Sequence, residues 1–388
     1  MMKIGVVGAG AMGSGIAQVA AQSGHKVYLF DTKQEALTLS EQKLDKVLKR
    51  LVEKEKISQE KANDIKGNIS YVDKLDSFSD TGLVIEAIIE NLDIKKSVFQ
   101  SLENIVDDAC ILATNTSSLS VTSIAGACRL PERVIGIHFF NPAPLMPLVE
   151  IIPALQTEEL ITATTRAMID SWKKVTVLTK DTPGFIVNRV ARPFYGEAIR
   201  ILEEGWANIA TIDWALTELG GFRMGPFTLT DFIGHDVNYV VTETVFKEFF
   251  YDQRYKPSFS QKRLVEAGRL GRKTGYGFYN YAEGATNNPV AIEDKAIGEK
   301  IVNRVLLMLI NEAADALFLN IATAKDLDLA MTKGVNYPKG LLAWANELGL
   351  EYVFDGLMEL YDEYHEDRYR PSPILRRMIQ NKETFVIK

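Results

Sequence analysis

Short apolar runs alternate with more polar segments from residue 3 to residue 152, and this pattern predicts an α/β domain. The runs are rich in Val, Ile and Leu, which is typical of strands buried on both faces of a parallel sheet. Helical periodicity follows the first strands, as in a chain that winds strand, helix, strand. We therefore predict a mostly parallel sheet covered by helices. The predicted strands are residues 3–7, 26–30, 82–87, 110–114, 134–140 and 148–152.

The first predicted strand runs directly into a glycine-rich turn, Gly8-Ala9-Gly10-Ala11-Met12-Gly13, which matches G-x-G-x-x-G. Gly8 permits the tight turn, Gly10 lets the backbone approach a pyrophosphate, and Gly13 lets the next helix pack closely on the sheet. The pyrophosphate is expected at the N-terminus of that helix, where N–H groups and the helix dipole favour an anion. The turn thus predicts a dinucleotide site, with a purely structural turn as the alternative.

Asp31 directly follows the second predicted strand. A carboxylate at this place accepts hydrogen bonds from the ribose hydroxyls of a bound dinucleotide and repels a 2′-phosphate. The sequence therefore favours NAD over NADP as the cofactor. The alternative for Asp31 is that it only caps the helix that follows.

A charged helix is predicted from Leu37 to Lys56. Its apolar positions form a single stripe along one side; they are Leu44, Val47, Leu48 and Leu51. Basic residues take many of the other positions, namely Lys43, Lys46, Lys49, Arg50 and Lys54. In an acidic protein such a cluster could hold the phosphates of a bulky anionic substrate. Glu53 and Glu55 nearby favour an ordinary solvated face instead, and the residues alone leave both interpretations open.

A run of small polar residues, Asn115-Thr116-Ser117-Ser118, follows the predicted strand 110–114. It lies at the carboxyl end of a strand, which is the edge where open α/β sheets bind ligands. Ser and Thr are also strong helix caps. The run is therefore equally compatible with a catalytic and with a capping role.

His138 and Glu150 lie in two otherwise apolar predicted strands, separated by a proline-rich turn. A single polar residue in such a strand is more often structural. A carboxylate that bonds one imidazole nitrogen, however, fixes the tautomer and raises the basicity of the other nitrogen. Together the two residues predict the general-base pair that an alcohol dehydrogenase without a metal requires.

The C-terminal half contains an internal repeat. Residues 186–190, Ile-Val-Asn-Arg-Val, recur at 301–305, an offset of 115 residues. Further identical pairs keep this offset: Glu197 and Glu312, Ala198 and Ala313, Asp213 and Asp328, Ala215 and Ala330, Gly225 and Gly340, and Gly234 and Gly349. We predict two homologous helical domains after the first domain. The predicted domains are 1–182, 183–281 and 298–388, with a linker at 283–289.

Composition adds a few exclusions. The formal charge of −7 argues against a nucleic-acid partner. No apolar run approaches the roughly 20 residues that a membrane helix needs, and residues 1–3 lead into the first strand without a signal peptide. Cys110 and Cys128 have no metal-ligand spacing. We therefore expect a cytoplasmic protein with no bound metal and no membrane partner.

Taken in order, the motifs resemble those of the 3-hydroxyacyl-CoA dehydrogenase family, which includes 3-hydroxybutyryl-CoA dehydrogenases. The resemblance runs from residue 2 to residue 280. It is carried by Gly8–Gly13, Glu86-Ala87-Ile88-Ile89-Glu90-Asn91, Asn115-Thr116-Ser117-Ser118-Leu119, His138-Phe139-Phe140-Asn141-Pro142, Asp181-Thr182-Pro183-Gly184-Phe185-Ile186-Val187-Asn188-Arg189, Met224-Gly225-Pro226 and Gly271-Arg272-Lys273-Thr274-Gly275-Tyr276-Gly277-Phe278-Tyr279.

The resemblance implies a Rossmann-type domain followed by two tandem all-α domains similar to the C-terminal domain of 6-phosphogluconate dehydrogenase. It implies reversible, NAD-dependent oxidation of (S)-3-hydroxyacyl-CoA to 3-oxoacyl-CoA, in fatty acid or butanoate metabolism. In short members the single helical domain pairs with that of a second subunit. Here the second copy would take that place, which predicts a monomer with an internal pseudo-dimer, or a weak homodimer.

Carried over residue by residue, the resemblance makes His138 the catalytic base and Glu150 its orienting partner. Ser117 and Asn188 correspond to the groups that hydrogen-bond the substrate. Lys54 lies near the family's contact to the coenzyme A phosphates, although the helix around it departs from the family pattern. The implied contacts to NAD are Gly8, Ala9, Gly10, Ala11, Met12, Gly13, Asp31, Glu90, Lys95, Asn115, Ser117, Asn141 and Lys273.

Two other classes of function compete with this one. A non-catalytic relative that keeps only the fold is disfavoured because Ser117, His138, Glu150 and Asn188 are all present. A dehydrogenase of free β-hydroxyacids uses a lysine base on a helix, and the strand and turn at 134–142 argue against it. The second helical copy has no counterpart of His138 or Glu150 and is therefore expected to be structural.

Overall fold

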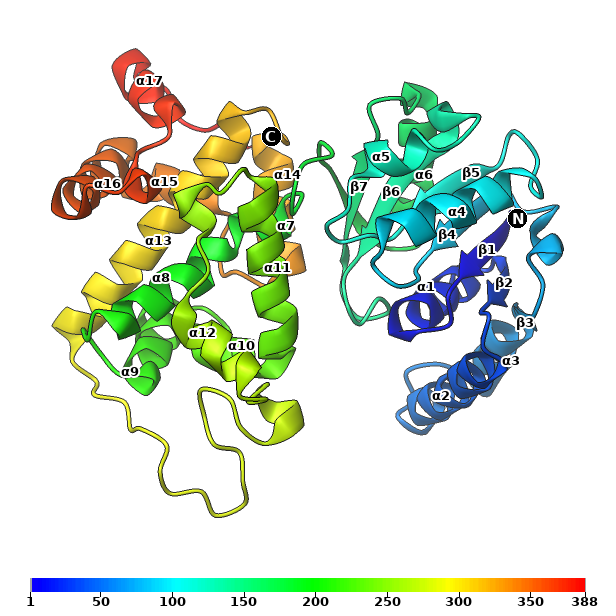
Figure 1. The fold of residues 1–388 in the computed structure, drawn as a ribbon, viewed down its shortest axis with the longest axis horizontal. Coiled ribbons are helices and arrows are strands. Elements are labelled where there is room, and N and C mark those ends of the chain that lie inside the picture. Colours follow the sequence, from blue (N-terminus) through cyan, green and yellow to red (C-terminus); the bar gives the residue numbers. More distant parts are fainter. Residues whose placement is uncertain (1, 388) are drawn as a thin grey trace. The chain divides into compact units, whose positions relative to one another are not determined.

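The six predicted strands and two further strands, one at each edge, form one eight-stranded sheet in a computed structural model, which describes residues 2–387 (Figure 1). The strand order is β3-β2-β1-β4-β5-β6-β7-β8; the first six strands of the chain run parallel, and β7 is antiparallel to β6 and parallel to β8. The strands are β1 (Lys3–Val7), β2 (Lys26–Phe30), β3 (Ile69–Val72), β4 (Leu83–Glu86), β5 (Ile111–Thr114), β6 (Val134–Phe139), β7 (Leu148–Pro153) and β8 (Val175–Leu178). The order β3-β2-β1-β4-β5-β6 is that of a Rossmann fold, which confirms the predicted fold class of this part.

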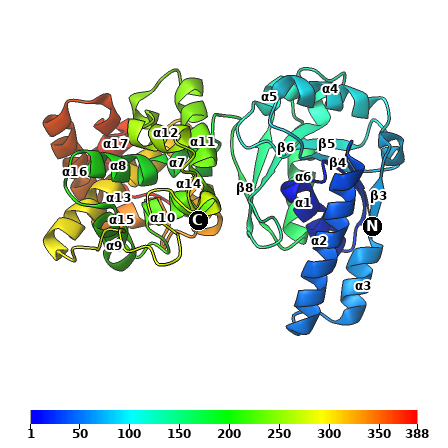
Figure 2. The ribbon, with the colours of Figure 1, turned by 60° about the horizontal axis from the view of Figure 1, so that its bottom comes forward.

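The sheet and its helices form the first of two compact units. The boundary between the two units in the sequence lies between Thr182 and Pro183. The central strands β4, β5 and β6 are buried along their whole length, because helices cover both faces of the sheet. The helices of this unit are α1 (Ala11–Gln22), α2 (Gln34–Glu53), α3 (Gln59–Gly67), α4 (Leu92–Glu103), α5 (Val121–Ala125) and α6 (Glu159–Ser171). Figure 2 shows α2 and α3 lying side by side.

The charged helix differs from its prediction in two respects. It spans Gln34–Glu53, so that Lys54 caps its C-terminus and Lys56 lies beyond it. Val47 is 41% exposed, because the buried stripe of the helix runs through Leu37, Leu44 and Leu48 instead. Val47 therefore lies at the edge of the apolar face, and its place in the predicted stripe was wrong.

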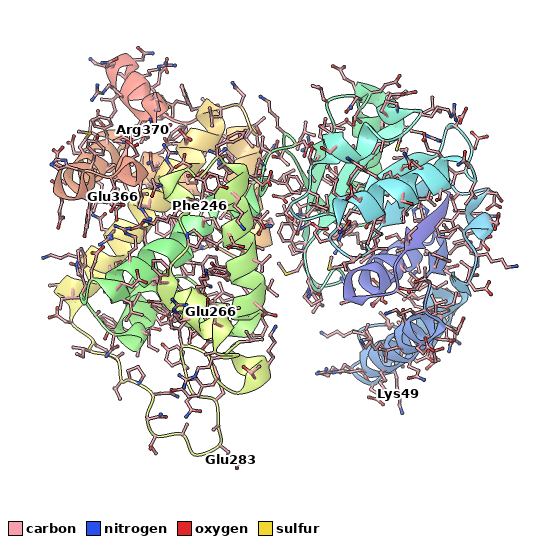
Figure 3. All side chains as sticks on the ribbon, viewed as in Figure 1. Lys49, Phe246, Glu266, Glu283, Glu366 and Arg370 are labelled. Carbon is pink, nitrogen blue, oxygen red and sulfur yellow. The ribbon has the colours of Figure 1, made fainter. Side chains whose placement is uncertain are left out.

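The second unit is helical. A long segment without helix or strand, residues 281–294, separates its two halves and forms the loop between α12 and α13 in Figure 1. Glu283 lies on this loop and is labelled in Figure 3. The helices are α7 (Val187–Val190), α8 (Arg192–Glu203), α9 (Ile209–Trp214), α10 (Pro226–Ile233), α11 (His235–Glu248), α12 (Phe259–Glu266), α13 (Lys295–Phe318), α14 (Ala324–Gly334), α15 (Leu341–Leu348), α16 (Leu350–Tyr364) and α17 (Pro373–Asn381).

Elements of the two halves of this unit correspond at the offset found in the sequence. The bounds of α10 and α15 differ by 115 residues at both ends, and α11 and α16 begin 115 residues apart. Side-chain contacts agree as well: Asp213 of α9 accepts hydrogen bonds from two N–H groups at the start of α10, and Asp328 of α14 does the same at the start of α15. The repeated residues therefore occupy equivalent structural positions.

Buried ion pairs link the two halves of the second unit. Arg189 in the first half pairs with Glu312 in the second at 2.5 Å, and Arg304 in the second pairs with Glu197 in the first at 3.1 Å. These four side chains are at most 3% exposed. The pairs map onto each other at the 115-residue offset, which is the reciprocal pattern of an interface with two-fold symmetry.

Candidate active site

The glycine turn joins β1 to α1 in the way the sequence predicts. Gly8 has a φ of +104°, which disfavours other residues. A Cβ on Gly13 would lie 1.8 Å from the carbonyl oxygen of Gly8, whereas a Cβ on Gly10 would meet no protein atom within 4 Å. The backbone at Gly10 is thus unobstructed beside the N-terminus of α1, and the turn fits the pyrophosphate of a dinucleotide.

Asp31 lies against this turn. Its Oδ2 accepts a hydrogen bond from the Ala9 N–H at 2.8 Å, and its Oδ1 accepts one from the Lys33 N–H at 2.9 Å. The carboxylate at the end of β2 is therefore fixed beside the glycine turn. This is the position from which a carboxylate reaches the ribose of a bound dinucleotide.

His138 and Glu150 face each other across β6 and β7. The antiparallel register makes them direct partners, so that their side chains stand on the same face of the sheet. The distance between His138 Nδ1 and Glu150 Oε2 is 2.7 Å, and the two residues are 6% and 0% exposed. The ring of Phe140 packs against the imidazole with the ring centroids 4.5 Å apart. A buried carboxylate thus orients the imidazole through Nδ1, as a general-base pair requires.

A half-buried lysine binds the turn between these two strands. Lys174, just before β8, donates from Nζ to the carbonyl oxygens of Ala143 and Met146, at 2.5 and 2.8 Å. Burial lowers the pKa of Lys174. The turn carries Asn141, an exposed residue with a cis bond to Pro142. No motif pointed to this role of Lys174, because its partners Ala143 and Met146 lie far from it in the sequence.

Glu90 accepts hydrogen bonds from the polar residues that follow β5. Its Oε1 accepts hydrogen bonds from Thr116 Oγ1 at 2.6 Å and from the Ser117 N–H at 3.0 Å, and the Ser117 hydroxyl lies 3.3 Å away. Burial by itself raises the pKa of Glu90, but the Lys95 ammonium at 3.2 Å and these hydrogen bonds outweigh it and lower the pKa below its usual value. Glu90 is therefore an anion that positions Ser117.

Two residues predicted to contact NAD have internal partners. The Lys95 side chain is 1% exposed, and its Nζ bonds Glu86 Oε1 at 2.6 Å. Asn115 accepts a hydrogen bond from the Phe139 N–H at 2.8 Å and so links the end of β5 to the end of β6. These contacts show that both residues brace the edge of the sheet, next to Glu90 and His138.

Asn188 and Lys273 belong to the second unit. Asn188 is a half-buried residue of α7, and Lys273 Nζ pairs with Asp236 at 2.6 Å. The loop around Lys273 is organised by Asp231, which is buried and which the motif analysis did not single out. Asp231 accepts hydrogen bonds from Phe278 N, Tyr279 N, Tyr281 Oη and His235 Nε2.

The basic residues of α2 lie on an exposed face, where Lys49 is labelled in Figure 3. Lys54 is also exposed. Between residues 2 and 387, no group of three or more His, Cys, Asp or Glu side chains could hold a metal ion. No helix in the same range is long and apolar enough to cross a membrane.

Comparison with known proteins places the chain in one family. The model described as "3-hydroxyacyl-CoA dehydrogenase, NAD binding domain" matches residues 3–182. The model described as "3-hydroxyacyl-CoA dehydrogenase, C-terminal domain" matches 184–281 and again 301–385. The chain therefore belongs to the 3-hydroxyacyl-CoA dehydrogenase family, whose members are NAD-dependent enzymes, and this confirms the predicted enzyme class and cofactor.

Individual relatives agree. The chain is 37% identical to the 3-hydroxyadipyl-CoA dehydrogenase of Escherichia coli (strain K12), over 96% of each protein. It is 43% identical to the probable 3-hydroxybutyryl-CoA dehydrogenase of Deinococcus radiodurans, over 72% of this chain and 100% of that one. The crystal structure of 3-hydroxybutyryl-CoA dehydrogenase from Escherichia coli K12 superposes with a TM-score of 0.92, at 35% identity and 98% coverage of both chains.

Proposed function

We propose that this chain oxidises the 3-hydroxyl group of a coenzyme A thioester, with His138 as the general base. The hydrogen bond between His138 and buried Glu150 carries the proposal. His138 lies near the carboxyl end of β6, and the glycine turn follows the carboxyl end of β1. Because these strands belong to the parallel part of one sheet, both features lie at the same edge.

We propose the following catalytic and binding roles for individual residues. Nδ1 of His138 is held by Glu150, so Nε2 is the nitrogen that takes the proton from the 3-hydroxyl. Glu150 then stabilises the imidazolium. Ser117, fixed by Glu90, and Asn188 hydrogen-bond the substrate oxygens and hold them in a reactive geometry. NAD, when bound, supplies the acceptor for the hydride that leaves C3. In the reverse reaction His138 returns the proton to a 3-oxoacyl thioester.

The cofactor would lie over the glycine turn, with the Ala9, Ala11 and Met12 backbone near its phosphates and Asp31 on its ribose. Asn141 and Lys273 are proposed as further contacts. Lys95 and Asn115 would act mainly by bracing Glu90 and the end of β6. The exposed position of Lys54 supports a contact with the phosphates of coenzyme A.

Asp31 provides a test of the cofactor site. Changing Asp31→Asn removes the charge that bonds the ribose hydroxyls, so the KM for NAD is expected to rise about 10-fold or more. The penalty against NADP should fall at the same time. Initial rates at varied NAD and NADP measure both effects. Asp64→Asn on the exposed side of α3 is the matched control, and equal KM values in the two variants would exclude Asp31 from the site.

The proposed reaction is tested by following absorbance of NADH while the protein acts on (S)-3-hydroxybutyryl-CoA and on (S)-3-hydroxyadipyl-CoA, the acyl chains in the names of the relatives. We expect NAD reduction with at least one of them and 3-oxoacyl-CoA as the product. Oxidation of free 3-hydroxy acids, with no reaction of either thioester, would overturn the proposal.

We further propose that residues 183–281 and 298–388 are two copies of one domain that pack as an internal pseudo-dimer. The reciprocal pairs of Arg189 and Arg304 and the two matches to the C-terminal family model support this. The chain would then work as a monomer in the cytoplasm. Light scattering should give a mass near 43.3 kDa, whereas an obligate dimer joined through residues 183–281 of both chains would refute the idea.

A further inference from the structure

Arg192, at the start of α8, is a buried cation without a carboxylate partner. It is 6% exposed, and no carboxylate oxygen of residues 2–387 lies within 4.0 Å of its guanidinium group. Its Nη1 donates a hydrogen bond to Thr242 Oγ1 at 3.1 Å, and its Nε has no partner. The guanidinium carbon lies 5.0 Å from the centre of the Tyr195 ring. Burial lowers the pKa of Arg192.

The other buried arginines are all paired with carboxylates. Glu103 pairs with Arg133, Glu312 with Arg189, Asp315 with Arg254, and Glu197 with both Arg304 and Arg368. An unpaired buried charge costs several kcal/mol of stability, on the order of what a core mutation costs. Arg192 thus carries an unfavourable charge that an incoming anion would neutralise.

A second unsatisfied donor lies close to Arg192. Tyr337, in the connection between α14 and α15, is 6% exposed, and its hydroxyl has no hydrogen-bond partner. Tyr337 and Tyr195 are both near enough to interact electrostatically with the guanidinium. The guanidinium group and the Tyr337 hydroxyl can both donate hydrogen bonds to a carboxylate, and such charge-assisted bonds are strong.

The position of Arg192 relates it to the proposed substrate. α8 follows α7 after a single residue, Ala191, whose backbone stays in the helical region (φ −80°, ψ −7°). Arg192 therefore comes slightly more than one turn, about 6 Å along the helix axis, after Asn188. Residues four apart on a helix are neighbours on its surface. A group held by Asn188 and a group held by Arg192 would thus be separated by a short carbon chain.

We propose that Arg192 binds the terminal carboxylate of a dicarboxylic acyl chain, so that the preferred substrates are 3-hydroxyacyl thioesters with a carboxylate at the far end. This inference rests on the proposed function, in which Asn188 holds an oxygen near C3 or the thioester. Of the two acyl chains considered above, it selects 3-hydroxyadipyl over 3-hydroxybutyryl.

The test compares two thioesters with six-carbon chains, (S)-3-hydroxyadipyl-CoA and (S)-3-hydroxyhexanoyl-CoA, which differ in a carboxylate against a methyl group. In the natural protein kcat/KM should favour the adipyl substrate. Arg192→Met should lower kcat/KM for the adipyl substrate on the order of 10²-fold and should change the hexanoyl value much less. Arg200→Met is the matched control, because Arg200 lies on the same helix and already pairs with Glu366, labelled in Figure 3. Its substrate ratio should stay unchanged.

Thermal unfolding gives a readout that does not depend on catalysis. Because Arg192→Met removes an unpaired buried charge, the ligand-free variant should have a higher Tm than the natural protein. If Arg192 had a structural role instead, the variant would have a lower Tm. Adipyl-CoA, which lacks the 3-hydroxyl, should stabilise the natural protein more than hexanoyl-CoA does, and the variant should lose this difference. Equal losses with both substrates together with a lower Tm would overturn the proposal. Failure of the natural protein to oxidise either thioester would instead refute the proposed function.

Discussion

Replacing His138 by alanine is expected to lower kcat by about 10²–10⁴-fold, the usual contribution of a positioned acid–base group. The reason is that Glu150 holds the imidazole at 2.7 Å in a buried site, and no water molecule reproduces that orientation. The affinity for NAD should change little, because His138 lies in β6 and not in the glycine turn. Steady-state kinetics and equilibrium binding of NAD measure the two quantities.

His25 supplies the matched control for this experiment. It belongs to the same unit, and its Nε2 accepts a hydrogen bond from Trp172 Nε1 at 3.0 Å, which is a structural contact. His25→Gln should therefore keep kcat near that of the natural protein. Glu150→Gln should lower kcat as well, since a neutral amide cannot stabilise the imidazolium. Unchanged turnover of His138→Ala would remove His138 from the mechanism.

Glu312→Gln is expected to destabilise the second unit by about 3 kcal/mol or more, the cost of breaking a buried ion pair. Glu312 pairs with Arg189 at 2.5 Å, accepts a hydrogen bond from Tyr255 at 2.5 Å, and lies 3.8 Å from Arg254. Without its charge, the two guanidinium groups share only Asp315. The free energy of unfolding, from urea denaturation followed by fluorescence, measures the loss.

The control is Glu299→Gln on the same helix, α13. Glu299 has a side chain that is 63% exposed and pairs loosely with Lys295 at 3.6 Å. Its loss should change the free energy of unfolding by no more than about 0.5 kcal/mol. Glu197→Gln should behave like Glu312→Gln, because Glu197 is its counterpart in the other half. Equal stabilities of the Glu299 and Glu312 variants would show that the ion pairs contribute nothing.

The strands that sequence analysis found all lie inside the sheet, with a neighbouring strand on each side. Those in the middle of the sheet have both faces covered, so their apolar runs are nearly continuous, as in β4 and β5. The two strands that it missed, β3 and β8, lie at the edges of the sheet. Each is only four residues long, and β3 includes Ser70 and Tyr71. An edge strand has an exposed side, and its sequence therefore resembles that of a loop.

The candidate site was predictable where it depends on local register. The contact between His138 and Glu150 could be predicted, because a short turn between two antiparallel strands aligns the residues on either side of it. Contacts from distant parts of the chain were not predictable, such as Lys174 on the turn or Asp231 on the loop of Lys273. Their residue types are common at surfaces, and only the tertiary fold gives them partners.

In the proposed mechanism the imidazole of His138 removes the proton from the 3-hydroxyl of the substrate. The most direct test is the distance between His138 Nε2 and the oxygen on C3 in a crystal structure of the natural protein with NAD and acetoacetyl-CoA. We expect a hydrogen bond of about 2.6–3.2 Å, with Nδ1 still bonded to Glu150. A complex in which another side chain donates to that oxygen, while His138 points away from it, would show that His138 is not the base.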